Sequence, residues 1–120
     1  MIVKFYDQVE DEKLKFAVIA ARAEGKWVFC KHKARTTFEM PGGHREPGEP
    51  ILDTARRELQ EETGATAFDL QPVCVYSVTD PDNFDGAETY GLLCTARVHA
   101  FGPIDSEMEK IVLTADLPTQ

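Results

Sequence analysis

Apolar residues fall along the chain in segments that predict one helix among several β-strands. Residues 13–23 contain a continuous apolar stretch, which predicts a strand in the middle of a sheet. The turn signal at 24–26 leads into a second strand at 27–33, so these two segments predict a hairpin. By the same criteria, further strands are predicted at residues 36–40, 68–79, 88–101 and 110–114.

Between the predicted strands lie an irregular loop and a helix. Residues 41–50 contain three prolines and three glycines, which predicts a loop of special shape. Residues 51–63 are rich in helix formers. Pro50 suits the first turn, where a missing N–H costs nothing, and Gly64 suits the left-handed residue just past the end. Strands, one helix and further strands predict an α+β or mixed α/β sandwich rather than a repeated βαβ array.

Chain length and charge restrict the class of protein. The chain of 120 residues has no internal repeat, so we expect one domain, 1–120, that can bury a core of its own. Its formal net charge of −8 disfavours contact with the backbone of duplex nucleic acid. No apolar stretch is as long as a membrane span, and acidic residues follow the start too closely for a signal peptide. We therefore expect a cytoplasmic protein with no membrane partner.

Three cysteines, Cys30, Cys74 and Cys94, each lie in an apolar, strand-like segment. Their number is odd and no two are close in sequence, so neither a zinc site nor a disulfide framework is indicated. We expect reduced thiols that pack as small hydrophobic side chains, which fits a reducing compartment.

Three glutamates, Glu58, Glu61 and Glu62, share one sector of the predicted helix at three- and four-residue spacing. Like charges at this spacing repel one another, and these lie toward the C-terminal end, where the helix dipole disfavours anions. One interpretation is a solvated acidic face, paired with Arg56 and Arg57. The other is a bound divalent cation, because carboxylate oxygens are the hard ligands that magnesium and manganese accept.

The residues around these glutamates favour the cation. Gly43 is followed after five residues by Glu49, and then after seven residues by Arg57-Glu58-Leu59, Glu61-Glu62, Gly64 and Ala65. Residues 43–65 thereby match G-x5-E-x7-R-E-U-x-E-E-x-G-U, where U is a bulky aliphatic residue and Ala65 is smaller than usual. This pattern is the Nudix box, and the chain resembles the Nudix hydrolase family, most closely its MutT-like branch.

The resemblance implies a fold and a reaction. Family members form a mixed-sheet α/β/α sandwich that usually ends in a second helix, for which residues 115–120 leave no room, so either this sequence is truncated or the helix is absent. A missing helix would expose one sheet face or favour dimerisation, so we expect a monomer or a homodimer. The enzymes bind Mg2+ or Mn2+, which neutralises the phosphates of a nucleoside-diphosphate derivative and activates the water that cleaves its phosphoanhydride bond.

The resemblance also implies roles for individual box residues. The implied metal ligands are the carboxylates of Glu58, Glu61 and Glu62 and the backbone carbonyl of Gly42. Arg57 is implied to pair with Glu49 and so to brace the loop against the helix. Glu58 and Glu61 are also candidates for the group that removes the proton of the attacking water.

Nudix enzymes differ in whether a box glutamate or one from a later loop takes this proton. Outside the box the best-placed candidate base is Glu88, which closes the polar loop 80–87 and opens the next strand. Glu107 and Glu109 are weaker rivals. The alternative is that Glu88 is one of several solvated acids in an acidic loop.

Substrate contacts outside the metal ligands are predicted from charge and aromatic character. Lys31, Lys33 and Arg35 form a local basic cluster upstream of the box, and Arg35 is favoured as a phosphate contact for its planar fork. Within the box loop, Arg45 is a second candidate and His44 a weaker one. The alternative for the basic cluster is a solvated strand edge. Three aromatic or thioether side chains are candidates for contact with a purine base: Phe38, Met40 and Phe84. The alternative is that they face the core, as aromatic residues at strand positions usually do.

The resemblance leaves several substrates open. The compact chain looks most like the MutT-like enzymes, which hydrolyse nucleoside triphosphates, including oxidised purine forms, to a monophosphate and pyrophosphate. Alternatives are removal of pyrophosphate from the 5′ end of RNA and hydrolysis of a nucleotide sugar or a dinucleoside polyphosphate. A non-catalytic nucleotide-binding module is the alternative from another class, but such a module is expected to lack the box glutamates, all of which are present here.

Overall fold

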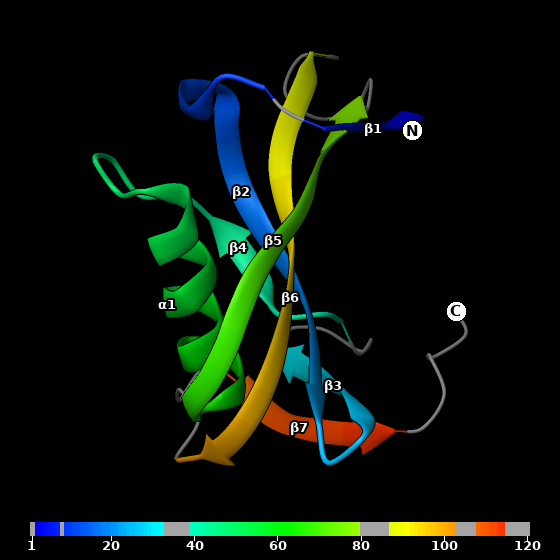
Figure 1. The fold of residues 1–120 in the computed structure, drawn as a ribbon, viewed down its shortest axis with the longest axis vertical. Coiled ribbons are helices and arrows are strands. Elements are labelled where there is room, and N and C mark those ends of the chain that lie inside the picture. The colour runs from blue at the N-terminus through cyan, green and yellow to red at the C-terminus, as the bar shows by residue number, and fades with distance from the viewer. Residues whose placement is uncertain (1, 8, 33–38, 80–86, 103–107, 115–120) are drawn as a thin grey trace.

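The computed structural model describes residues 2–7, 9–31, 39–79 and 87–102, together with the backbone of His32 and of residues 108–114. A mixed sheet packs against one helix, α1 (Figure 1). The elements are β1 (Ile2–Tyr6), β2 (Leu14–Ala23), β3 (Lys26–His32), β4 (Gly42–His44), α1 (Ile51–Thr63), β5 (Ala65–Thr79), β6 (Glu88–Phe101) and β7 (Met108–Thr114). The predicted α+β fold class is confirmed.

The central strand β2 fixes the loop that precedes the helix. The strand order is β1-β5-β6-β2-β3-β7, and β4 also pairs with β2. β2 runs parallel to β6 and antiparallel to β3 and β4. In the β2–β4 pair Gly42 lies opposite Val18 and Gly43 opposite Ala17. The first residues of the loop are therefore hydrogen-bonded into the sheet, directly beside α1.

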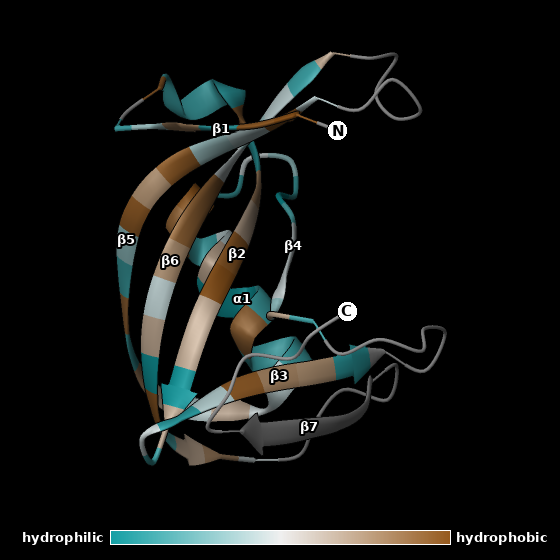
Figure 2. Ribbon diagram, turned by 90° about the vertical axis from the view of Figure 1, so that its right-hand side faces the viewer, coloured by the Kyte–Doolittle hydropathy of each residue, from teal (hydrophilic) through white to brown (hydrophobic). Residues whose placement is uncertain are grey.

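Alternate residues of β2 form the core with α1. Ala17, Ile19 and Ala21 are buried on the side of the sheet that α1 covers, and Ala55 and Leu59 of α1 are fully buried. Figure 2 shows that the hydrophobic segments of β2 and β6 run side by side across the middle of the sheet. On the helix, Ala55 and Leu59 thus face this core, while Leu52 is only partly buried.

The helix and its ends agree with the sequence. α1 spans Ile51–Thr63, Pro50 precedes it in extended conformation, and Gly64 has a φ of 77° in the left-handed region. The amide of Gly64 donates to the carbonyl of Gln60 at 2.9 Å and closes the last turn. Glycine suits position 64 because it has no Cβ, whereas other residues adopt a left-handed φ only at a cost in free energy.

Other predicted elements differ from those observed. The strand β1 was not expected, and the loop 41–50 contains the short strand β4. The strand expected at 36–40 is described only at its end, where Glu39 forms a two-way backbone bridge with Cys30. Residues 36–38 lie outside the described part of the chain.

The cysteines are free thiols, as expected. Cys30 and Cys94 are buried and Cys74 is partly exposed. Burial raises the pKa of the Cys94 thiol to about 11, so it packs as a neutral group. Among the described residues, no helix has the length and apolar character needed to cross a membrane.

Truncating Leu59 should destabilise the fold, because its side chain is fully buried between α1 and the sheet. We expect Leu59→Ala to lower the free energy of unfolding by about 2–5 kcal/mol, measured by urea denaturation. Leu52→Ala removes the same atoms from a partly buried position on the same helix and should cost clearly less. Equal losses in the two variants would contradict the assigned packing.

Candidate active site

Arg57 and Glu49 form a two-pronged ion pair that joins the loop to the helix. Arg57 donates from Nε to Glu49 Oε2 at 2.8 Å and from Nη2 to Glu49 Oε1 at 3.0 Å. The Thr54 hydroxyl donates to Glu49 Oε1 at 2.7 Å, and the Glu46 amide donates to the same oxygen at 3.2 Å. This is the pairing that the box implied. The hydrogen bonds from Arg57 and then Thr54 lower the pKa of Glu49 to about 2.

The remaining nitrogen of Arg57 reaches two of the candidate metal ligands. Its Nη1 donates to Glu58 Oε1 at 2.6 Å and to Glu61 Oε2 at 3.3 Å. Its Nη2 also donates to the backbone carbonyl of His44 at 3.0 Å. One guanidinium group therefore contacts the loop backbone, the Glu49 carboxylate and two helix glutamates at once. The hydrogen bond to Glu49 above all, and then the bond to Glu58, raise the pKa of Arg57 above its ordinary value, so the guanidinium stays charged.

Glycines at the start of the box loop let the glutamates approach the backbone. A Cβ on Gly43 would overlap the carboxylate of Glu58. A Cβ on Gly42 would overlap the carbonyl oxygen of Ala17 on the neighbouring strand. The Gly42 amide donates to Glu62 Oε1 at 2.6 Å. The two glycines thus allow the loop backbone to lie against both the sheet and the helix carboxylates.

The three helix glutamates do not converge on one point in this arrangement. Within the described ranges, no group of three acidic, histidine or cysteine side chains is placed to hold a metal ion. Glu58 and Glu61 contact Arg57, whereas Glu62 contacts the Gly42 amide. Burial, partly offset by Arg57, raises the pKa of Glu58 above its ordinary range.

The donor set nevertheless has the chemistry that a divalent cation requires. Glu58, Glu61 and Glu62 supply hard oxygen donors from adjacent turns of one helix, and Gly43 lets the Glu58 carboxylate lie against the loop backbone. Each of the three already holds a favourable partner, so cation binding exchanges the contacts to Arg57 and Gly42 for contacts to the ion. The ligand roles themselves remain a prediction.

Arg45 makes hydrogen bonds to the protein itself that the sequence did not indicate. Its Nε donates to the Glu49 carbonyl, its Nη1 to the Asp11 and Leu14 carbonyls at 2.8 and 3.2 Å, and its Nη2 to Asp11 Oδ2 at 2.7 Å. The side chain is 19% exposed. Arg45 therefore ties the loop to the residues before β2, and contact with a substrate phosphate remains a prediction that would require some of these bonds to be exchanged.

Several other candidate residues lie in parts of the chain that the structure does not describe. Arg35, Lys33, Phe38, Phe84 and Glu107 lie outside the described residues, as does the side chain of Glu109. Among the described candidates, Met40 is exposed and His44 lies edge-on to Phe16, with ring centroids 6.4 Å apart.

Glu88 is held by three hydroxyl groups. Tyr6 and Ser77 donate to Oε2 at 2.7 and 2.5 Å, and Tyr90 donates to Oε1 at 2.7 Å. These bonds, led by Ser77, lower the pKa of Glu88 to about 2. So weak a base removes a proton poorly near neutral pH. The geometry thus favours an anchoring role for Glu88, which links β1, β5 and β6; its role as base remains a prediction.

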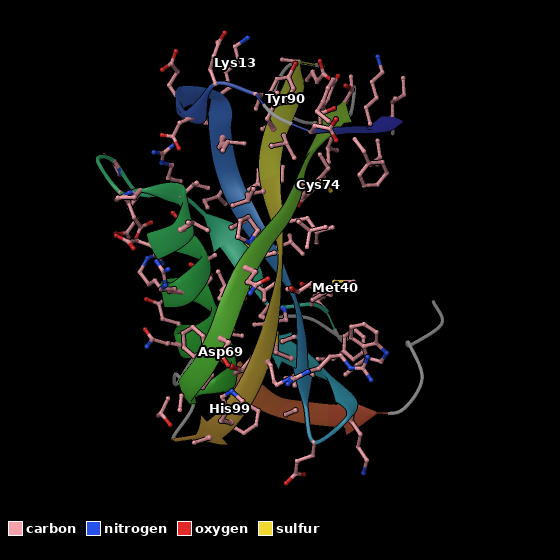
Figure 3. The ribbon with its side chains drawn as sticks, in the orientation of Figure 1. Lys13, Met40, Asp69, Cys74, Tyr90 and His99 are labelled. Atoms are coloured by element: carbon pink, nitrogen blue, oxygen red, sulfur yellow. The ribbon has the colours of Figure 1, made fainter. Side chains whose placement is uncertain are left out.

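A cavity of about 650 Å³ connects Glu88 to the box loop. Its lining residues are Glu12, Lys13, Lys15, His44, Arg45, Glu88, Thr89 and Tyr90. Figure 3 shows Lys13 and Tyr90 at the same end of the sheet. No sequence pattern pointed to Lys13, Lys15 or Tyr90, because their proximity depends on the parallel pairing of β2 with β6, where Leu14 lies opposite Tyr90.

Removing the Arg57 side chain should impair the site because the glutamates lose their fixed positions. We expect Arg57→Ala to lower kcat by at least about tenfold, because Glu49, Glu58 and Glu61 lose a shared partner, while Mn2+ affinity stays within a few fold. Arg57→Lys keeps the charge but not the planar fork of donors, so its kcat should lie between those of the parent and of Arg57→Ala. An increase in KM alone, with kcat unchanged, would show that Arg57 does not position the site.

The Glu88 cluster should make stability depend on acid pH. Its folded pKa of about 2 lies below the ordinary 4.5, so its stabilising contribution is present above pH 4.5 and is lost as the pH falls toward 2. Glu88→Gln should therefore lower the melting temperature at neutral pH, with a gap that closes in acid. Glu10→Gln, at an exposed pair with Lys13, is the matched control and should show no such gap. A gap that stays constant with pH would contradict the assignment.

Comparison with known proteins agrees with the geometry. The family model for the NUDIX domain matches residues 11–115. The putative 8-oxo-dGTP diphosphatase YtkD of Bacillus subtilis is 37% identical over 76 residues, which cover 63% of this chain and 48% of that protein. The ADP-ribose pyrophosphatase of Bacillus subtilis is 44% identical over 64 residues, covering 50% of this chain and 35% of that protein. The matches thus span less than half the length of these curated relatives.

Solved structures share the fold across nearly the whole chain. The Bacillus subtilis pyrophosphohydrolase BsRppH, solved as a point mutant, superposes with a TM-score of 0.82 and 28% identity, covering 97% of this chain and 73% of that one. A NUDIX hydrolase from Nitrosomonas europaea gives a TM-score of 0.68 at 23% identity, covering 85% of this chain and 72% of that one. The sequence pattern, the loop–helix geometry and these matches together show that the chain belongs to the NUDIX domain family.

Proposed function

We propose that this chain hydrolyses a phosphoanhydride bond of a nucleoside triphosphate, including oxidised purine forms, to a nucleoside monophosphate and pyrophosphate. The observation that carries the proposal is the clamp of Arg57 on Glu49, which holds the glycine loop against a helix that presents Glu58, Glu61 and Glu62. A non-catalytic module would have no need for this complete acidic set. The putative 8-oxo-dGTP diphosphatase YtkD supports the same class of substrate.

A divalent cation, Mg2+ or Mn2+, is the cofactor that this donor set would hold. Its ligands would be Glu58, Glu61 and Glu62, with the backbone carbonyl of Gly42. When bound, such an ion neutralises phosphate charge and lowers the pKa of water. The chain itself keeps the ligands in place: Arg57 fixes the loop, and the absence of side chains on Gly42 and Gly43 lets the loop backbone lie against β2 and the Glu58 carboxylate.

The cavity beside the box loop is the proposed place for the rest of the substrate. Lys13 and Lys15 bring positive charge to its lining, and Tyr90 brings an aromatic ring. Glu88 belongs to the same lining with its pKa lowered to about 2, so it presents a fixed negative charge. A fixed carboxylate accepts hydrogen bonds from the N–H groups of a base, whereas the lysines suit phosphates.

The 5′-triphosphate of RNA is the second candidate substrate. The observation that favours it is the likeness to the pyrophosphohydrolase BsRppH, which extends over 97% of this chain. Both substrates present a triphosphate to the same glutamates. They differ beyond the first nucleotide, because the rest of an RNA chain must pass out of the open cavity. The ADP-ribose pyrophosphatase makes ADP-ribose a further substrate to include in tests.

A substrate panel tests the proposal. The purified protein with Mg2+ would be assayed with dGTP, 8-oxo-dGTP, 5′-triphosphorylated RNA, ADP-ribose and a dinucleoside polyphosphate, and the products would be separated by chromatography. The proposal predicts the highest kcat/KM for a free nucleoside triphosphate, with pyrophosphate as a product. A preference for triphosphorylated RNA would establish the second candidate, and no turnover of any member would overturn the assignment as a hydrolase.

The box glutamates should be essential for this turnover. Glu62→Gln and Glu58→Gln keep the size of each side chain but remove its charge, so each should lower kcat by about a hundredfold or more. Chelation with EDTA should abolish activity of the parent. Asp53→Asn removes a charge from an exposed position on the same helix and should leave kcat nearly unchanged. Near-normal turnover in Glu62→Gln would refute the metal-ligand assignment.

A further inference from the structure

Two arginines lie side by side on the sheet. Arg22 of β2 and Arg97 of β6 are register partners on neighbouring strands, so their side chains leave the same face. Trp27 of β3 is the partner of Arg22, and Asp69 of β5 is the partner of Arg97. These four residues therefore form one row across four strands. Figure 3 shows Asp69, beside His99, at the opposite end of the sheet from Lys13 and Tyr90.

Among the described residues, no acidic side chain forms an ion pair with either of these arginines. Arg97 has no hydrogen bond or ion pair with another residue in the described part of the chain. Arg22 donates from Nη2 to the Gly25 carbonyl at 3.0 Å and lies 4.7 Å over the ring of Trp27. Asp69 contacts His99 instead, with 2.8 Å between Oδ2 and Nε2. Neighbouring guanidinium groups repel each other, so an anion between them would be stabilised.

The arginines line a cavity of about 780 Å³, which we call the arginine cavity. This volume lies in the range of small-molecule sites. On the face of the sheet that Arg22 and Arg97 share, its lining also includes Trp27, Asp69, Gln71 and Thr95, so two arginines and one acidic side chain lie together there in a chain of net charge −8. The rest of the lining includes Arg56 of α1 together with Phe68 and Leu70, which lie on the side of the sheet that α1 covers.

We propose that the arginine cavity binds a nucleoside monophosphate at a second, non-catalytic site. Planar guanidinium groups bind phosphate through paired N–H donors, and Arg22 and Arg97 are adjacent enough to share one phosphate group. The indole ring of Trp27 and the polar side chains of Gln71 and Thr95, on the same face, suit the base. None of its lining residues lines the cavity beside the box loop. The proposal therefore concerns a second site and does not depend on the catalytic assignment.

The single tryptophan of the chain provides a direct readout. Trp27 lines the arginine cavity and already contacts Arg22, so a bound phosphate should change its fluorescence. The protein would be titrated with AMP at low salt and with EDTA, which keeps divalent cations from the box. We expect saturable binding of AMP, a weaker response to inorganic phosphate, none to adenosine, and an affinity for AMP that falls as salt is added.

Two arginine variants and two controls locate the site. Arg97→Gln should raise the Kd for AMP by about tenfold or more, and Arg97→Lys should give an intermediate value because it keeps the charge without the fork. Lys4→Gln removes a positive charge from β1, outside the lining, and should bind like the parent. Glu58→Gln should also bind like the parent, because the box is not involved. Circular dichroism melting would verify that each variant is folded.

The outcomes separate the proposal from its rivals. A lack of any fluorescence change with AMP, or the same Kd in Arg97→Gln as in the parent, would overturn it. Sulfate that binds as tightly as AMP would show an unselective anion site and would also overturn it. A response to AMP that disappears in Glu58→Gln would assign the binding to the box. If Arg97→Gln did not fold, an unchanged Kd in Arg97→Lys would carry the same negative result.

Discussion

The site depends on one guanidinium group that contacts the loop and the helix at the same time. Arg57 makes five hydrogen bonds, to Glu49, Glu58, Glu61 and the carbonyl of His44. A loop with three glycines in ten residues has much conformational freedom to lose, and a single bidentate pair restricts it strongly. The pairing of β4 with β2 supplies the second restraint, at the other end of the loop. Between these two restraints, the carboxylates and the backbone amides lie at fixed separations.

This arrangement explains how a helix tolerates three glutamates near its C-terminal end. Without a cation, Arg57 offsets the charge of Glu58 and Glu61, and the Gly42 amide offsets that of Glu62. A cation must compete with the existing contacts, so its affinity reflects the difference between two sets of interactions, and a phosphate-bearing substrate that contributes further ligands tips this balance.

The sequence predicted the parts of the protein that rest on local chemistry. The ends of α1 follow from Pro50 and Gly64, and the Arg57–Glu49 pair was implied by the resemblance of residues 43–65 to the Nudix box. Strand β1 was not predicted, because Ile2, Val3 and Phe5 are largely exposed and show no buried alternation. The Glu88 cluster could not be predicted either. It joins Tyr6, Ser77 and Tyr90 from three strands, and their contact depends on strand order and register, which no local pattern encodes.

Register also explains why positive charge gathers at a place that the sequence did not indicate. Along the chain, the evident basic group is Lys31, Lys33 and Arg35, because these residues are neighbours in sequence. Arg22 and Arg97 are far apart in sequence, and only the parallel pairing of β2 with β6 makes them neighbours. A net charge of −8 averages over such a feature and says nothing of where the positive charges gather. Local potential, and not the total, determines where an anion binds, because screening in salt limits each charge to its immediate surroundings.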